Sequence, residues 1–121
     1  MRYGRIMCGK SVWAERAERA VSFRERMRGL LGRDAPGTGA ALLIERCGAV
    51  HTVGMRFALD LVFLDRAWRV ARVVRGVRPG RLMVWGGWRA ASVLETEAGC
   101  AELSRLAAGQ ELRWENVSGK G

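Results

Sequence analysis

The sequence predicts a single, mainly β domain: a β-sandwich or barrel of about seven short strands, with one packed N-terminal helix and a second short helix. A chain of 121 residues is long enough for one hydrophobic core, so residues 1–121 are treated as one domain. Short apolar runs bounded by glycine or charged residues recur along it, which is typical of strands. Two segments instead carry helix signals.

The N-terminal third contains one weak strand signal and one strong helix signal. Residues 12–17 alternate weakly and predict an edge strand. Ser22 and Glu25 then form a capping box, in which a hydroxyl and a carboxylate three residues later satisfy the first helix amides. One apolar stripe follows at helical spacing, made of Phe23, Met27, Leu30 and Leu31. Gly32 suits the end of this helix, so the prediction is a helix over 22–31 and a loop over 33–39.

The remaining chain reads mainly as strands. Strands are predicted over 40–44, 50–53, 58–64, 91–95 and 112–117, and a short helix over 101–108 that stops at Gly109. Residues 66–77 are ambiguous, because arginine recurs there at every third position. They could form a basic amphipathic helix suited to polyanions or membrane surfaces, or a strand. The β-branched valines and the possible turn at 65–68 favour a hairpin with the preceding strand.

Composition narrows the class of protein. A hydrophobic content of 49% is typical of a globular chain, and no apolar run reaches the length of a membrane helix. No signal peptide is visible, because Lys10 interrupts the apolar residues near the N-terminus, so a cytoplasmic location is expected. The net charge of +9 would attract polyanions. However, 19 of the 21 basic residues are arginine, and abundant Arg, Ala and Gly also reflect GC-rich codons, so nucleic-acid binding is not favoured.

The cysteines argue against two structural roles. Cys8, Cys47 and Cys100 are odd in number, widely spaced and include no C-x-x-C pair. This pattern favours free, buried thiols that behave as small hydrophobic side chains over a disulfide framework or a structural zinc site.

Four short motifs occur in the order seen in one known family. They are R-x-x-G-L-x-G-R at 26–33, C-x-x-x-H-T-x-x-M at 47–55, D-x-x-F-x-D at 60–65 and V-L-E-x-x-x-G at 93–99. Together they resemble the uncharacterised "domain of unknown function 192" family, and the resemblance covers about residues 12–117. It implies a compact, mainly β fold with one packed helix and no established activity. Many relatives are exported or lipid-anchored, and some occur in bacterial genomes beside pilus-assembly genes. The chain departs from close relatives at Gly80, where they carry tryptophan, and at Gln110, where the family usually carries aspartate.

The second motif contains the only histidine, His51, in the same run as a soft thiol ligand and a thioether. Cys, His and Met together suit copper or zinc, and a Cys47–His51 pair oriented by Asp60 would suit nucleophilic catalysis. In an extended strand, however, Cys47 and His51 would lie about 13 Å apart. The alternative is that His51 and Thr52 bond to backbone groups near a turn. The candidate ligand or functional cluster comprises Cys47, His51, Thr52, Met55, Asp60 and Glu95.

Asp60 and Glu95 are carboxylates inside otherwise apolar strands. A charge buried there needs an arginine partner or several donors. An ion pair with Arg56 or a clamp on backbone amides is the structural interpretation of Asp60. A pocket wall shared with His51 is the functional one, and Glu95 invites the same two interpretations.

The five tryptophans are many for this length, and most are expected in the core. Trp85 and Trp88 flank two glycines and are followed by Arg89, so they could instead form an exposed interaction loop. Such a loop would suit a protein, a carbohydrate or a single-stranded nucleic acid.

Three functional hypotheses follow. The first is a small non-enzymatic binding or accessory module with no cofactor and a possible protein partner, whose ligand lies near His51, Met55 and Asp60 or contacts the Trp85–Trp88 loop. The second is a metal-binding protein or enzyme built on Cys47, His51 and Asp60. The third is nucleic-acid binding through the arginines.

Overall fold

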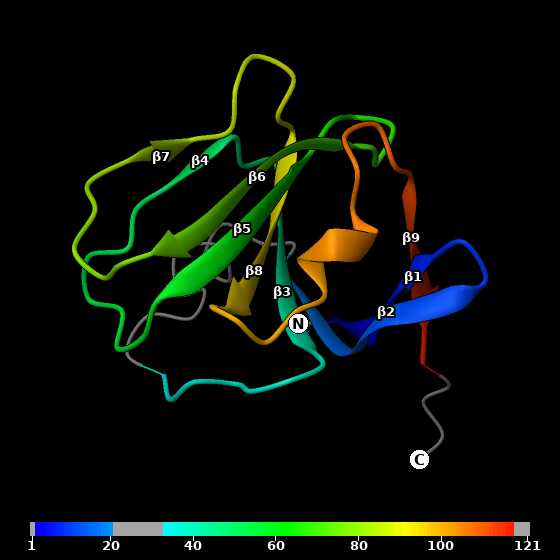
Figure 1. Cartoon of the computed structure of the whole chain (residues 1–121), viewed down its shortest axis with the longest axis horizontal. Helices are drawn as coiled ribbons and strands as arrows, with labels where there is room; N and C mark the ends of the chain where they lie inside the picture. Colours follow the sequence, from blue (N-terminus) through cyan, green and yellow to red (C-terminus); the bar gives the residue numbers. More distant parts are fainter. Residues whose placement is uncertain (1, 21–32, 118–121) are drawn as a thin grey trace.

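The computed structural model describes residues 2–20 and 33–117, which form a strongly bent β-sheet with a small two-stranded layer beside it (Figure 1). The strands are β1 (Arg2–Cys8), β2 (Ser11–Ala20), β3 (Ala40–Glu45), β4 (Ala49–Val50), β5 (Leu59–Leu64), β6 (Val70–Val77), β7 (Val84–Trp85), β8 (Ser92–Glu97) and β9 (Leu112–Asn116). The prediction of a mainly β chain is confirmed.

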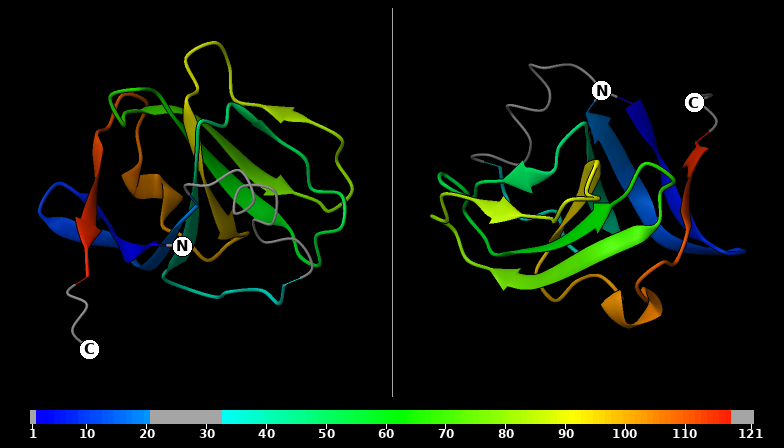
Figure 2. Two further views of the ribbon diagram at one scale, coloured as in Figure 1. Left: turned by 180° about the vertical axis from the view of Figure 1, so that it is seen from behind. Right: turned by 90° about the horizontal axis from the view of Figure 1, so that it is seen from above.

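The seven-stranded sheet has the order β6-β5-β8-β3-β2-β1-β9, and β4 pairs with β7 separately. Its neighbours are antiparallel except β2 and β3, which are parallel. The two edges approach each other at one end, where Arg69 bridges to Glu111 and the Leu112 amide donates to the Trp68 carbonyl at 2.9 Å. The sheet therefore curls into a partly closed barrel, as the view from above in Figure 2 shows.

Residues 12–17 do not form an edge strand as predicted, because β2 lies between β1 and β3. The weak alternation of its sequence reflects a barrel wall in which small alanines face inward. Ala14 and Ala17 of β2 are buried in the interior cluster.

Two hydrophobic clusters lie on the two faces of this sheet. The interior cluster receives at least one buried side chain from each of the seven strands: Ile6, Ala17, Leu43, Val62, Val70, Leu94 and Leu112. The second cluster, on the outer face of β3, β5, β6 and β8, is covered by Val50 of β4 and Val84 of β7. Because both faces of β5 are covered, all six of its residues are buried.

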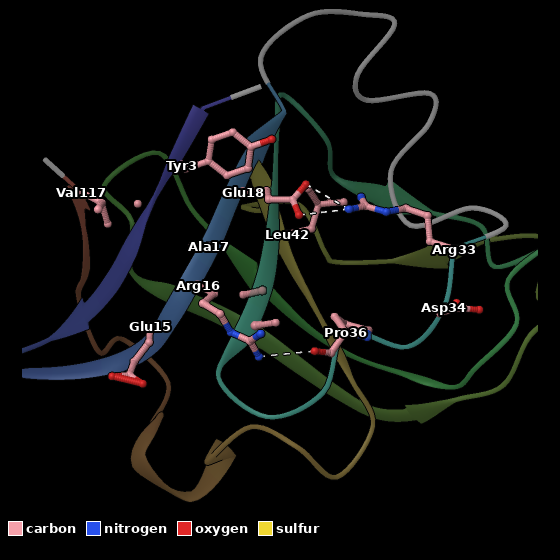
Figure 3. Close-up of a pocket in the computed structure, with 13 residues that line it drawn as sticks. Tyr3, Glu15, Arg16, Ala17, Glu18, Arg33, Asp34, Pro36, Leu42 and Val117 are labelled. Carbon is pink, nitrogen blue, oxygen red and sulfur yellow. Dashed lines mark hydrogen bonds and ion pairs between the residues drawn. The ribbon is translucent and has the colours of Figure 1, made fainter. Parts of the chain in front are cut away.

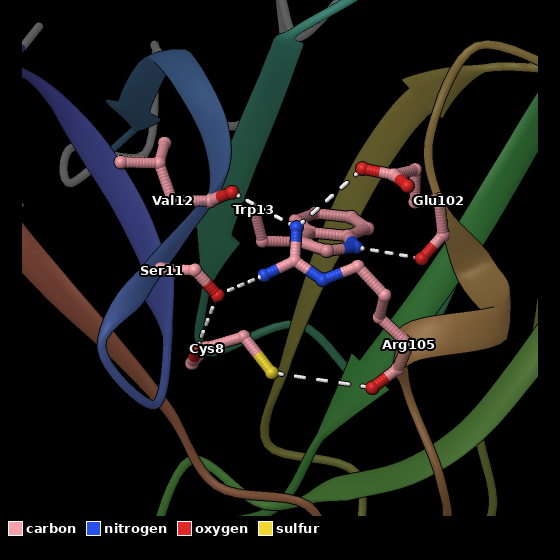
Figure 4. Close-up of polar contacts among 6 residues, drawn as sticks. All are labelled: Cys8, Ser11, Val12, Trp13, Glu102 and Arg105. Atoms are coloured by element: carbon pink, nitrogen blue, oxygen red, sulfur yellow. Dashed lines mark hydrogen bonds and ion pairs between the residues drawn. The ribbon is translucent and has the colours of Figure 1, made fainter.

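The predicted fold class is wrong in its helices, since the described residues contain no α-helix. The helix expected over 101–108 is a single 3₁₀ turn, η1 (Leu103–Arg105). Its backbone and side chains bond to the β1–β2 hairpin instead of continuing a helix (Figure 4). Trp13 Nε1 donates to the Glu102 carbonyl at 3.0 Å, and Arg105 Nη1 donates to the Val12 carbonyl at 2.9 Å. The helix expected over 22–31 lies outside the described residues.

Within residues 66–77, Val70–Val77 form the second strand of a β5–β6 hairpin, so the strand interpretation is confirmed. Asp65 Oδ1 accepts the amides of Ala67 and Arg69, both at 2.9 Å, and so holds the turn. Two register irregularities in β6 break its strict alternation. With these irregularities and an outer edge position, β6 can carry arginine at every third residue and still leave Arg72 and Arg75 exposed.

Of the segments that the structure describes, none is a helix long and apolar enough to cross a membrane.

Candidate functional site

Thr52 holds the segment after β4 against the loop after β6. Its side chain is fully buried, and Oγ1 donates to the Arg78 carbonyl at 2.7 Å while accepting the Arg81 amide at 2.8 Å. Its backbone adds two bonds to the same loop, to Gly80 and Arg81, each at 2.9 Å. Thr52 therefore satisfies backbone groups near a turn, and it positions the start of the segment that carries Trp85.

The other residues of the C-x-x-x-H-T-x-x-M motif are placed differently. Cys47 is half-buried against the outer cluster, and its thiol donates to the Ala49 carbonyl at 3.0 Å. Met55 packs on the same cluster. His51 is exposed and makes no hydrogen bond with a described residue. Within residues 2–20 and 33–117, no group of three or more His, Cys, Asp or Glu side chains is arranged to hold a metal ion.

Asp60 is a clamp on backbone amides. Its Oδ1 accepts the Gly76 amide at 2.8 Å and its Oδ2 accepts the Gly99 amide at 2.9 Å. Both glycines have positive φ, +62° and +83°, so the clamp ties an irregularity in β6 to the turn after β8, and other residues would adopt these conformations only with strain. Arg56 is not its partner, because Arg56 pairs with Asp34 at 3.3 Å on the surface.

Asp60 does not share a face of the sheet with Cys47 and Met55. Its strand neighbours Val62 and Leu64 face the interior cluster, whereas Cys47 and Met55 pack on the outer one. The carboxylate lines a hollow of about 440 Å³ together with Arg75 and Glu102. Both of its oxygens are already engaged with amides there.

Glu95 lies on the outer face, opposite to Asp60. It is directly paired with Leu42 of β3 and Leu61 of β5, so its carboxyl is flanked by aliphatic side chains. Burial raises the pKa of Glu95 to about 7. The two strand carboxylates therefore do not form an acid–base pair.

Trp85 and Trp88 form an exposed aromatic pair. Trp88 is 93% exposed and Trp85 is 42% exposed, and their rings meet edge to face with centroids 5.0 Å apart. Arg72 of β6 donates from Nη1 to the Trp85 carbonyl at 3.2 Å, which links the pair to the sheet edge. Trp88 lies in the connection between β7 and β8, which is the loop at the top of Figure 1.

A hollow of about 560 Å³ lies beside Trp88, and Arg69 and Arg89 line it. The acidic residue of this lining, Asp65, already accepts two backbone amides of the β5–β6 turn. We call the side chains of Arg69, Arg72, Trp85, Trp88 and Arg89 the aromatic–arginine platform.

Two glycines allow the chain to form this platform. A Cβ on Gly86 would lie 2.2 Å from the Phe63 ring, so only glycine lets the loop approach the sheet so closely. Gly87 has φ +98° and turns the chain, and its carbonyl accepts the Ala90 amide at 3.2 Å. As a result, Trp85 and Trp88 lie on either side of the two glycines, with Trp88 inside the tight turn, and their rings are in contact.

The platform belongs to a longer basic segment. Residues 66–94 contain no Asp or Glu and seven arginines: Arg66, Arg69, Arg72, Arg75, Arg78, Arg81 and Arg89. All seven are exposed, and none forms an ion pair in the described part of the chain. The same segment exposes Leu82 at 85% and Met83 at 63%. It therefore combines unneutralised positive charge with exposed apolar side chains.

A third hollow, of about 560 Å³, is lined partly by β2 and β3, and its charged residues differ from those beside Trp88 (Figure 3). Its lining includes Arg16, Glu18, Arg33 and Asp34, and these charges are engaged within the chain. Arg33 pairs with Glu18 at 3.0 Å, and Arg16 donates to the Thr38 carbonyl at 2.6 Å. Glu15 also lines this hollow and is exposed, so the hollow presents to an anionic ligand a carboxylate but no arginine that is not already bonded.

Sequence reasoning named Trp85, Trp88 and Arg89 but not Arg69 or Arg72. The sequence nevertheless contains a signal that points to these two arginines: a run of 29 residues without Asp or Glu, in which arginines are regularly spaced. Their proximity to the tryptophans depends on the β5–β6 hairpin, which places β6 beside the β7 loop.

Comparisons with known proteins identify the fold. The family model DUF192, described as "Uncharacterized ACR", matches residues 7–114. A crystal structure of a protein of unknown function from Novosphingobium aromaticivorans DSM 12444 superposes with a TM-score of 0.78 at 18% identity, over 93% of this chain and 84% of the other. A putative transcription regulator from Sinorhizobium meliloti 1021 gives 0.75 at 20% identity, over 94% and 96% of the two chains. No curated protein sequence matches the chain.

Proposed function

Since the chain belongs to the uncharacterised DUF192 family, family membership does not supply an activity, and we propose a function from the site itself. The protein is a non-enzymatic binding module for an anionic ligand. The ligand contacts the aromatic–arginine platform. The observation that carries the proposal is the exposure of Trp88 next to arginines that have no ion-pair partner in the described residues.

Exposed charge and exposed aromatic surface support this function together. Monomeric proteins seldom expose large apolar side chains in groups unless a partner covers them. Tryptophan and arginine are also the residues most enriched among the energetically important contacts of binding surfaces. The hollow between Arg69 and Arg89 suits a phosphate, sulfate or carboxylate, because guanidinium groups bind such oxygens through paired hydrogen bonds.

We also propose that the module works in the cytoplasm. None of Cys8, Cys47 and Cys100, all within the described residues, forms a disulfide. Half-buried thiols without disulfides are typical of a reducing compartment.

Elution from a heparin matrix in a salt gradient tests the binding function. The platform variant Arg69→Gln/Arg89→Gln is compared with Arg2→Gln/Arg46→Gln, which removes the same charge from exposed arginines outside the segment 66–94. We expect the platform variant to elute at clearly lower salt than the control, because local contacts add to the general attraction of a +9 protein. Identical elution of the two variants would show that only net charge matters and would refute the proposal.

A further inference from the structure

We infer that the anionic ligand of the platform is the surface of a bilayer that contains acidic phospholipid. This inference rests on the proposed binding function and names its partner. The arginines would bind lipid headgroups, while the exposed apolar side chains of the same segment would enter the headgroup–acyl boundary.

The apolar side chains favour a lipid partner. Leu82, Met83 and Trp88 are among the most exposed large hydrophobic residues that the structure describes. They lie on the segment between β6 and β8, which follows the outer margin of the molecule in Figure 1. Aliphatic side chains have no preferred partner in water, but they gain free energy on entering a membrane interface, where tryptophan is also favoured.

The charges complement an anionic bilayer. The seven exposed arginines of residues 66–94 are uninterrupted by acid in the sequence, and an arginine close to an acidic membrane strengthens binding about fivefold. Arg69 and Arg89 line the hollow beside Trp88, where a headgroup phosphate would accept from both guanidinium groups. The headgroup contact and the apolar contact therefore adjoin at Trp88.

The ring geometry distinguishes this partner from a single-stranded nucleic acid. Bases bind to aromatic side chains by stacking on their faces, one base after another. Trp85 and Trp88 are at 88° to each other and in edge contact, so they do not present two parallel faces to successive bases. Leu82 and Met83 have no aromatic face at all. Lipid insertion makes no such demand on ring orientation.

Sedimentation with vesicles measures the partition of the full chain. Phosphatidylcholine vesicles with and without about 30 mol % phosphatidylglycerol are compared at about 0.15 M salt. We expect binding only to the acidic vesicles and a loss of about twenty-five-fold for Arg69→Gln/Arg89→Gln relative to the charge-matched Arg2→Gln/Arg46→Gln. Leu82→Ser/Met83→Ser should lose about tenfold, whereas Tyr3→Ser, which removes an exposed aromatic of β1, should not.

Quenching by lipids brominated in the acyl chain locates the insertion. Trp13 is buried and Trp68 and Trp114 are partly buried, so the quenchable emission should come mainly from Trp88 and Trp85. We expect acidic brominated vesicles to quench the wild type and to quench Trp88→Phe markedly less. All variants should keep the wild-type circular dichroism spectrum, because every substituted residue is exposed.

The outcomes separate the partner from the function. If acidic vesicles do not bind while a poly-glutamate peptide or an oligonucleotide binds in a platform-dependent way, the lipid inference is wrong and the binding function stands. If no anionic probe distinguishes the platform variant from its matched control, both are wrong. Vesicle binding without quenching of Trp88 would also overturn the inserted geometry.

Discussion

Glu95 offers a sharp test of the packing described above. Its carboxyl lies between Leu42 and Leu61 on the outer face of the sheet, and burial raises its pKa from 4.5 to about 7. No other charge contributes to this shift, so the ionised carboxylate is simply less well solvated in the folded chain than in the unfolded one. The perturbation is Glu95→Gln, which keeps the size of the side chain and removes its titration.

The sign and size of the expected stability difference between Glu95→Gln and the wild type follow from the linkage between protonation and folding. Between pH 4.5 and about 7 the folded chain keeps a proton on Glu95 that the unfolded chain has lost. Stability from this residue is therefore present at low pH and is lost as pH rises through the folded pKa. The shift of about 2.5 pH units corresponds to about 3 kcal/mol at alkaline pH. Glu95→Gln should thus gain about 3 kcal/mol over the wild type as pH increases from about 4 to about 8.

Urea unfolding at several pH values, followed by tryptophan fluorescence, measures this difference. Using the difference between variant and wild type cancels the pH dependence that other groups of this basic chain contribute. Glu15→Gln removes an exposed carboxyl and serves as the matched control. A wild-type-to-Glu95→Gln difference that stays constant with pH would refute the reasoning.

Three further substitutions test individual contacts by urea unfolding. Asp60→Asn should lower the free energy of unfolding by about 1–3 kcal/mol, because Asp60 uses both oxygens to accept backbone amides. Asp65→Asn should lower it little, because Asp65 accepts both of its amides on one oxygen. Equal losses in the two variants would contradict the clamp. Thr52→Val should lower the free energy of unfolding by about 2 kcal/mol and speed amide hydrogen exchange at residues 78–81. Thr52→Ser retains the hydroxyl and should exchange as slowly as the wild type. A valine variant as stable as the wild type would show that the buried hydroxyl is dispensable. Gly86→Ala should lower the free energy of unfolding by at least about 2 kcal/mol, because the added methyl group clashes with Phe63. The same substitution should lower it less in a Phe63→Leu background. An equal loss in both backgrounds would contradict the clash.

Several strands could be predicted because their signals are local. The apolar runs that became β3 and β5 lie within one or two residues of their predicted bounds, since strands buried on both faces are continuously apolar. β1 was missed, because Arg2–Cys8 mixes charged, glycine and apolar residues without a clear period. Its place in the sheet comes from pairing with β2, which follows it in a hairpin, and with β9, which lies at the other end of the chain.

The candidate site shows the same limit. Thr52, Asp60 and Trp88 could be selected from residue type and neighbours. Sequence could not decide whether Asp60 would meet His51, an arginine or the two glycine amides, because the answer depends on an irregularity in β6 and on the turn after β8. In the same way, Arg69 joined the platform only through the hairpin that returns β6 toward the β7–β8 loop.

The sequence by itself determined a mainly β chain of net charge +9, with an arginine-rich, acid-free segment and tryptophans next to paired glycines. The tertiary structure alone decided that the sheet curls until β6 and β9 meet, that the two strand carboxylates lie on opposite faces, and that 101–108 is a 3₁₀ turn. The physical reason is that local propensity depends on near neighbours in the chain. Strand register and the partners of buried polar groups depend on segments that only the folded chain brings together.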